Sequence, residues 1–341
     1  MDWKPELSFT DDTLIFGSFS RGYKAGGGNP PGPDWNDANS NYPVLPRTFS
    51  PEYVNAFEIG TKNSLQGGKL MLSGSAFYYD YKDYQVSQFI DRAMHTETFD
   101  AKTWGVEFEA AWAPSRNFRL DATLGWLNTR IADGATSVDV MDRPQGRTDY
   151  TVMRPWPTSP MTCIVPNEIL GRYIQNLDVK NAAISSTGNI FIKMLCPGPT
   201  VFQNGFLPGS IWSTAYKDQW GPLVYDPLTY IDPVTGVHAT NQGRGFSADL
   251  SGNSLPNAPE LTFNIGAQYR IVLPSSWDLM IRGDYYRQSD SYARVYNSEY
   301  DRLKAWGNLN LSATLINPDK NIAVQVLVSY THLTLPTKRI V

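Results

Sequence analysis

The residue types that most often carry catalysis or bind metals are few in this chain, and their spacing forms no site. The three histidines, His95, His238 and His332, lie far apart, and no cysteine stands beside any of them. Zinc sites need three or four such ligands, usually in short, regular spacings. The sequence therefore predicts no catalytic residue, no metal site and no cofactor, and a protein that is not an enzyme.

A glycine-rich stretch and a pair of carboxylates also lack the surroundings that chemistry would need. Gly26-Gly27-Gly28-Asn29 lacks the following Lys-Ser/Thr and helix of a phosphate-binding loop, which favours an ordinary flexible loop. Glu107 and Glu109 are two residues apart and would share one face of a strand. They are predicted to be solvated charges that meet neighbours such as Arg119, rather than an acid–base pair.

The two cysteines, Cys163 and Cys196, are too few for a disulfide scaffold. In an exported protein they could form one bridge with each other. The alternative is two unpaired thiols, and the sequence leaves both open.

The composition excludes several classes of protein. Of the 341 residues, 41% are hydrophobic and 18% are charged, with a formal net charge of −4, which gives no support for nucleic-acid binding. No apolar run approaches the roughly 18 residues of a transmembrane helix. The 19 tyrosines and 10 tryptophans are many for a soluble domain but natural for a membrane barrel with aromatic girdles.

The stretch Thr103–Arg130 reads as a hairpin of two strands. Apolar residues occupy every second position on both sides of the turn at Pro114–Asn117, and polar residues fill most of the positions between them. Trp104 and Trp112 bracket the first apolar face, and Phe118 and Trp126 bracket the second. Eight residues of strand span roughly 26 Å, or about 20 Å along the axis of a tilted barrel. This spacing favours a lipid-facing band over the core of a soluble sandwich.

The same rule recurs along the chain, so the fold predicted is an all-β, partial transmembrane antiparallel barrel. Tight turns alternate with long connections, as in outer-membrane barrels. A strand end is expected at Met1–Lys4, and a short connection at Asp91–Thr98. The predicted full strands outside the hairpin are Leu14–Tyr23, Val54–Ser64, Lys69–Phe89, Leu261–Ile271, Trp277–Tyr285, Leu303–Leu315 and Ile322–Val328. The predicted aromatic girdle is Trp104, Trp112, Phe118, Trp126, Tyr269, Trp277 and Tyr285.

The periodicity divides the chain into four parts. Residues 1–131 and 256–328 are predicted to be barrel strands, and residues 132–255 a long extracellular loop insertion rich in proline. A short helix is expected within Asn167–Ser185 and a short strand at Asn189–Leu195. Residues 329–341 resemble adapter or vector read-through and are predicted to be a non-native tail.

Three segments resemble the TonB-dependent outer-membrane receptors: Ser18–Gly27, Pro51–Leu65 and Ser251–Arg270. The resemblance implies a 22-stranded barrel filled by an N-terminal plug, of which about nine or ten strands lie here. Plug, TonB box and the first half of the barrel would then precede these residues, and the absence of a signal peptide at Met1 agrees with that.

The resemblance implies that the chain is the C-terminal fragment of a receptor that imports a scarce ligand, siderophore-like or another small organic compound. Its partners would be outer-membrane lipid, the TonB complex through the plug, and the small-molecule ligand; its location would be the outer membrane of a Gram-negative bacterium. A passive porin-like channel and a soluble β-rich binding protein are the alternatives.

The ligand-binding residues are not predicted. Aromatic side chains of the insertion and of the third strand could offer flat contact area to a ligand, or could pack a small core of their own. These residues are Trp156, Tyr173, Trp212, Tyr216, Trp220, Tyr230, Tyr79, Tyr81 and Tyr84.

Overall fold

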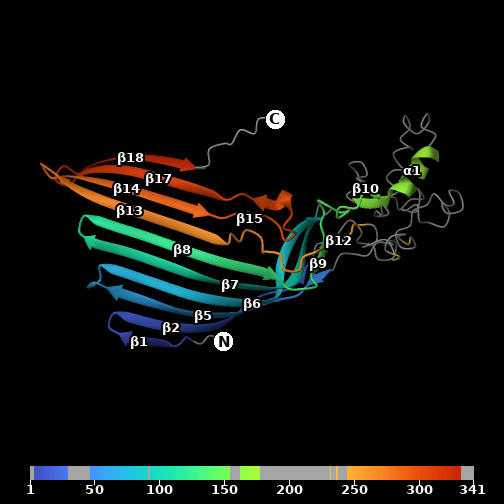
Figure 1. Cartoon of the computed structure of the whole chain (residues 1–341), viewed down its shortest axis with the longest axis horizontal. Helices are drawn as coiled ribbons and strands as arrows, with labels where there is room; N and C mark the ends of the chain where they lie inside the picture. The colour runs from blue at the N-terminus through green and yellow to red at the C-terminus, as the bar shows by residue number, and fades with distance from the viewer. Residues whose placement is uncertain are drawn as a thin grey trace.

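The computed structural model describes residues 4–29, 47–90, 93–153, 162–176, 231, 236 and 244–331. Most of them belong to one antiparallel sheet of ten strands (Figure 1). In their spatial order the strands are β1 (Glu6–Thr10), β2 (Thr13–Lys24), β5 (Glu52–Leu65), β6 (Leu70–Ile90), β7 (Ala93–Ser115), β8 (Phe118–Ile131), β13 (Leu261–Leu273), β14 (Trp277–Gln288), β17 (Trp306–Asn317) and β18 (Ile322–Thr331).

The sheet is a partial barrel, as predicted. Each of its strands pairs with a strand that is adjacent in the chain or separated only by loop elements, and β1 and β18 form its two edges without pairing to each other. Short turns join the strands at one end, here called the turn end, and longer segments leave from the opposite loop end (Figure 1). At the β5–β6 turn, Gln66, Gly67 and Gly68 all have positive φ, so glycine is needed where the chain reverses.

Period-two alternation gives the sheet one apolar and one polar face. The strand registers place one apolar row across five strands, from Ile59 on β5 to Leu261 on β13. The members of this row are Ile59, Ala76, Val106, Trp126 and Leu261. Ile59 is 63% exposed and Val106 46% exposed, so no protein layer covers this face. An uncovered apolar face of this extent marks a contact surface for lipid or for another protein.

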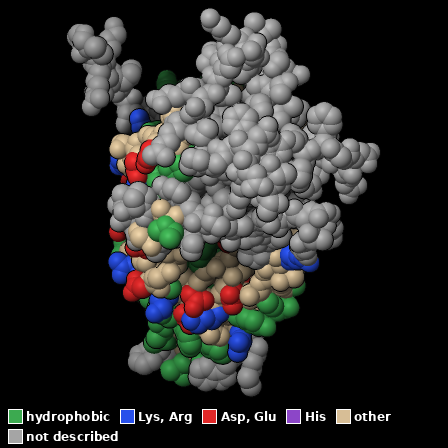
Figure 2. Space-filling view, turned by 90° about the vertical axis from the view of Figure 1, so that its right-hand side faces the viewer, with side chains coloured by type: hydrophobic (Ala, Val, Ile, Leu, Met, Phe, Trp, Pro, Cys, Tyr) green, Lys and Arg blue, Asp and Glu red, His purple; other side chains and the backbone are tan. Residues whose placement is uncertain are grey.

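The polar face carries a chain of ion pairs across β8 and β14. Asp121 contacts Arg119 at 2.8 Å and Arg282 at 3.5 Å, and Arg282 also contacts Asp284 at 2.5 Å. The expectation that Arg119 meets the glutamates at 107 and 109 is wrong, because Asp121 lies two residues away on the same face. In Figure 2, charged side chains of both signs gather in the middle of the visible face, with hydrophobic side chains at their sides.

At the loop end, β6 and β7 extend far beyond the rest of the sheet. Their ladder continues to the pair Ile90–Ala93, so the predicted connection at Asp91–Thr98 is wrong. A bulge between Tyr81 and Tyr84 marks where the extension begins. The extension is stable because its polar-face side chains are buried by other segments, a contact that local sequence does not show.

The smaller elements lie towards the loop end of the molecule (Figure 1). They are β3 (Gly27–Gly28), β4 (Thr48–Phe49), β9 (Thr136–Val138), β10 (Tyr150–Met153), β11 (Cys163–Pro166), α1 (Asn167–Asn176), β12 (Ser247–Asp249), β15 (Ser291–Tyr292), η3 (Glu299–Asp301) and β16 (Arg302–Leu303). The helix predicted within Asn167–Ser185 is confirmed, and the strand predicted at Asn189–Leu195 lies outside the described residues. Residues 1–3 of the expected strand end do so too, and the first described strand begins at Glu6.

No helix in the described part of the chain is long and apolar enough to cross a membrane. The last strand, β18, continues its ladder with β17 to Thr331, three residues into the range predicted to be a non-native tail. The division of the chain into four parts stays a prediction.

Candidate ligand-binding site

A small hydrophobic core lies at the loop end, where three segments meet the polar face of the β6–β7 extension. We call it the loop-end core. Its buried members are Val86, Phe99, Ala101, Ile131, Ala248, Leu250, Leu255 and Val295. Tyr81 and Tyr84 pack against it from the bulge in β6, with their ring centroids 5.4 Å apart. Both tyrosines therefore pack against a local core, and Tyr84 also lines the pocket beside it.

A pocket of about 750 Å³ opens beside this core, and we call it the loop-end pocket. One wall is the end of β6 from Tyr84 to Phe89. The other walls come from Met141 after β9, from Pro256, and from the segment of residues 293–301 between β14 and β17. Its size lies in the range of small-molecule sites, and its lining combines aromatic rings with few polar groups.

One arginine is held between two buried carboxylates at the pocket wall. The guanidinium of Arg294 donates to Asp301 at 2.5 Å and 3.1 Å, and to Asp139 at 2.6 Å and 3.3 Å. The side chains of Asp139 and Asp301 are 3% and 5% exposed. We call these three residues the arginine triad. It ties the segment after β9 to the segment between β14 and β17.

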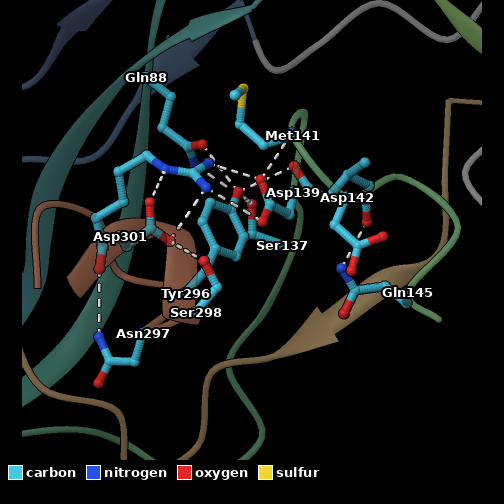
Figure 3. Close-up of polar contacts among 12 residues, drawn as sticks. Gln88, Ser137, Asp139, Met141, Asp142, Gln145, Tyr296, Asn297, Ser298 and Asp301 are labelled. Atoms are coloured by element: carbon cyan, nitrogen blue, oxygen red, sulfur yellow. Dashed lines mark hydrogen bonds and ion pairs between the residues drawn. The ribbon is translucent and has the colours of Figure 1, made fainter. Parts of the chain in front are cut away.

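A second polar cluster joins the same loops to the β6–β7 extension (Figure 3). The carboxylate of Glu97 accepts hydrogen bonds from Gln88 and Ser137, both at 2.6 Å. The hydroxyl of Tyr296 lies 2.9 Å from that of Ser137 and 2.8 Å from the side-chain oxygen of Gln88. We call these four residues the clasp, because they come from three separate segments of the chain.

Burial perturbs the acid–base chemistry of the clasp. It raises the pKa of Glu97, against the hydrogen bonds from Ser137 and Gln88 and the charge of Arg244, which lower it. Burial also raises the pKa of Tyr296 to about 12. Gln88 and Tyr296 of the clasp also line the pocket, so the shifts mark a buried junction beside it.

His95 stands opposite Gln88 on β7 and is 4% exposed. Its Nδ1 atom has no hydrogen-bond partner among the residues that the structure describes. Burial lowers the pKa of His95, and the charge of Arg244 lowers it further. Among the described residues, no group of three or more His, Cys, Asp or Glu side chains could hold a metal ion.

The predicted girdle residues fall into two groups in the sheet. Trp112, Phe118 and Tyr269 form a row at the turn end, with ring centroids 6.1 Å and 6.5 Å apart. Trp277 starts β14 at the same end. Towards the loop end, Trp104 pairs with Tyr78, and the indole of Trp126 donates to Glu260 at 3.1 Å. Tyr285 pairs with Ile265, further along β14. Their role as a girdle stays a prediction.

Other predicted site residues are only partly within the described chain. Cys163 on β11 is fully buried, but Cys196 lies outside the described residues, so a bridge between them stays a prediction. The same limit applies to the side chains of Trp156, Tyr173, Trp212, Tyr216, Trp220 and Tyr230.

Tyr79 stacks on Phe77 on the polar face, with ring centroids 5.0 Å apart. Tyr84 lines the pocket itself.

The arginine triad and the clasp were not foreseen from the sequence. Their members come together over as many as 208 positions of the chain, between Gln88 and Tyr296. The local sequence signal for this site is the high share of Arg, Tyr and Asp in residues 292–302.

Residues 2–161 match the family model described as TonB dependent receptor-like, beta-barrel. A comparison with curated proteins gives no match. Among solved structures, the siderophore receptor PiuA from Acinetobacter baumannii aligns with a TM-score of 0.50 and 14% identity, over 96% of this chain and 30% of that receptor. The ferric yersiniabactin uptake receptor FyuA from Yersinia pestis aligns with a TM-score of 0.49 and 13% identity, over 97% of this chain and 31% of that receptor.

At 14% identity, the likeness to PiuA supports the fold alone. The chain spans about a third of the length of the receptors that it matches. The matched family is one of transport receptors.

Proposed function

We propose that this chain, whose residues 2–161 match the TonB-dependent receptor β-barrel, forms part of an outer-membrane receptor. That receptor would import a scarce small organic ligand. The observation that supports this most is the ten-stranded sheet whose apolar face is uncovered and whose loop end holds a pocket. The apolar face would contact outer-membrane lipid of a Gram-negative bacterium. The loop-end pocket would contact the ligand first.

In this proposal the described residues have separate tasks and none is catalytic. The polar face, with Asp121, Arg282 and Asp284, would line the inside of the barrel, where charge is tolerated. The loop-end segments would capture the ligand. Energy for release and passage would come from TonB through a plug that is contributed by other residues of the whole receptor.

Two measurements on the full-length receptor test the proposal against its alternatives. We expect the receptor in the outer-membrane fraction, with heat-modifiable migration in gels. We also expect liposomes that contain it to exclude arabinose, because a plugged barrel offers no open pore. Recovery from the soluble fraction would favour a β-rich binding protein, and free passage of arabinose would favour a passive channel.

Dependence on TonB is tested separately. The full-length receptor should bind the purified periplasmic domain of TonB, and a receptor lacking its N-terminal segment should not. Binding that does not depend on that segment would contradict the proposed coupling.

A further inference from the structure

Large apolar side chains stand exposed around the loop-end pocket. Phe89 is 67% exposed, Met141 69% and Tyr300 92%. Phe89 lies on the extension of β6, well past Tyr78, which pairs with the predicted girdle residue Trp104. With the predicted girdle at Trp104, Phe89 lies beyond the lipid layer. Exposed apolar patches outside a membrane mark binding surfaces, and here the patch surrounds a pocket of about 750 Å³.

The lining offers flat contact area. The rings of Tyr84, Tyr296 and Tyr300 come from β6 and from the segment of residues 293–301, and the thioether of Met141 stands at the mouth. Aromatic rings attract one another edge-to-face or offset, and sulfur also packs favourably on rings. An aromatic group in the pocket would gain these contacts in addition to its burial.

The charge of the lining disfavours an anion. Arg294 is the one cation among the described residues that line the pocket. Four of its hydrogen bonds go to Asp139 and Asp301, and its guanidinium also lies over the ring of Tyr296 at 4.9 Å. A guanidinium has five N–H donors, so almost its whole capacity is used. Two carboxylates for one cation leave the triad with an excess of negative charge.

We infer that the loop-end pocket binds an uncharged aromatic group of a small organic ligand and rejects the corresponding carboxylate. The inference deepens the proposed import function and rests on it. The arginine triad determines this specificity. The charge of Arg294 is already balanced by Asp139 and Asp301, so it does not attract a carboxylate of the ligand. The rings supply the attraction, and the buried carboxylates supply the discrimination.

The test uses the full-length receptor in nanodiscs of zwitterionic lipid, with empty nanodiscs as background. Two probes share one ring system: naphthylmethanol, which is uncharged, and naphthoate, which is an anion. Saturation-transfer NMR titrations should give a dissociation constant about tenfold lower for naphthylmethanol. Naphthoate binding equally well or more tightly would overturn the inference.

Two variants test whether naphthylmethanol binds in the loop-end pocket. Ala293→Trp fills the pocket from an exposed position on its wall and should abolish binding of naphthylmethanol. Ala113→Trp, the same change at an exposed position of the turn end, should leave binding unchanged. Retention of binding by the Ala293→Trp receptor would show that the probe binds elsewhere and would overturn the inference.

A third variant tests whether the arginine triad causes the preference for naphthylmethanol over naphthoate. Asp301→Asn keeps the size of the side chain and removes one negative charge, so the preference for the uncharged probe should narrow several-fold. An unchanged preference would mean that the triad does not set it. Heat-modifiable migration of each variant confirms a folded barrel. Because membrane location and arabinose exclusion are measured independently, failure of the inference is distinguishable from failure of the proposed function.

Discussion

Glu97 accepts hydrogen bonds from Gln88 and Ser137 in a site that burial makes unfavourable for its charge. Its pKa in the folded protein is raised above the ordinary value of 4.5. The folded state therefore holds the proton more tightly than the unfolded state does. The stability that this carboxyl contributes is complete below its unfolded pKa and is lost as the pH rises through the folded pKa.

We predict that Glu97→Gln stabilises the clasp relative to the natural residue at pH 7.5, so that the amides around the clasp exchange more slowly. The amide keeps an acceptor oxygen for Ser137 but carries no charge to desolvate. The advantage should shrink as the pH falls towards 4. Hydrogen exchange of the amides in residues 95–98 and 137–139 measures it, after correction for intrinsic exchange rates.

His95 changes the stability of the natural protein and of the Glu97→Gln variant alike, so comparing the two at each pH cancels its contribution. The pKa of that histidine is lowered, so its own contribution rises with pH through the folded pKa up to the unfolded value of 6.5. Glu107→Gln, at an exposed position of the polar face, is the matched control and should show no pH-dependent advantage. An advantage of Glu97→Gln that is independent of pH would contradict the prediction.

The arginine triad gives a second prediction at this scale. Arg294→Met leaves Asp139 and Asp301 buried without their cation, which should destabilise the junction by about 3–5 kcal/mol. Amides in residues 291–303 should then exchange at least about a hundredfold faster, while those of β13 and β14 should not change. Adding Asp139→Asn and Asp301→Asn should recover part of the protection, because neutral amides cost less to bury. Equal loss in the single and triple variants would show that packing, and not charge, holds the junction.

Among the elements, the contact between β7 and β8 depends on a glycine. A Cβ atom on Gly105 would stand 2.2 Å from the carbonyl oxygen of Trp126 and 2.8 Å from the ring of Phe77. The carbonyl belongs to the neighbouring backbone, so relief requires the two strands to separate. Gly105 thus lets the strands approach while the ring of Phe77 covers the space on the polar face.

We predict that Gly105→Ala lowers the yield of folded full-length receptor severalfold. The measure is the fraction that shows heat-modifiable migration in outer membranes. Gly74→Ala is the control, because a Cβ atom there meets only ordinary contacts at 3.8 Å. If both variants fold equally well, the close approach at Gly105 is not what limits the pairing of β7 with β8.

The regular strands were predictable because their signal is local. Alternation and turn residues suffice for Thr103–Arg130, and the structure pairs Trp104 to Trp112 on β7 with Leu120 to Asn128 on β8. The β6–β7 extension was not predictable. His95, Glu97 and Phe99 share its inner face, and the first two look like surface residues in the sequence. In the structure Ser137 binds Glu97, and Leu250 and Val295 join Phe99 in one core.

The candidate site was less predictable than the fold for the same reason. Arg294 and Asp139 are 155 positions apart, and each reads as an ordinary loop charge in the sequence. Only the register of β13 and β14 against β8, combined with the length of the β6–β7 extension, brings these loops together. Local patterns specify strands, whereas the pocket depends on how several connections fold over one another.

At the scale of the whole molecule, the sheet separates two environments. Its apolar face has no protein cover, and its polar face carries ion pairs that would be costly in lipid. Within the described part of the chain, β1 and β18 are the two edges of the sheet, and open edges are not tolerated in lipid. We therefore predict that the chain produced alone in a bilayer gives open or aggregated species, unless further strands pair with both edges.

A pair of neighbouring substitutions tests which face contacts lipid. Val106 lies in the exposed apolar row, and Glu107 points to the opposite face one residue later. Val106→Arg should raise the free energy of the folded full-length receptor by about 2–4 kcal/mol, because its charge would sit within the hydrocarbon layer. Glu107→Arg should be tolerated, since the polar face already holds Arg119 and Arg282. The fraction of receptor with heat-modifiable migration measures both, and equal tolerance of the two variants would mean that the apolar row does not face lipid.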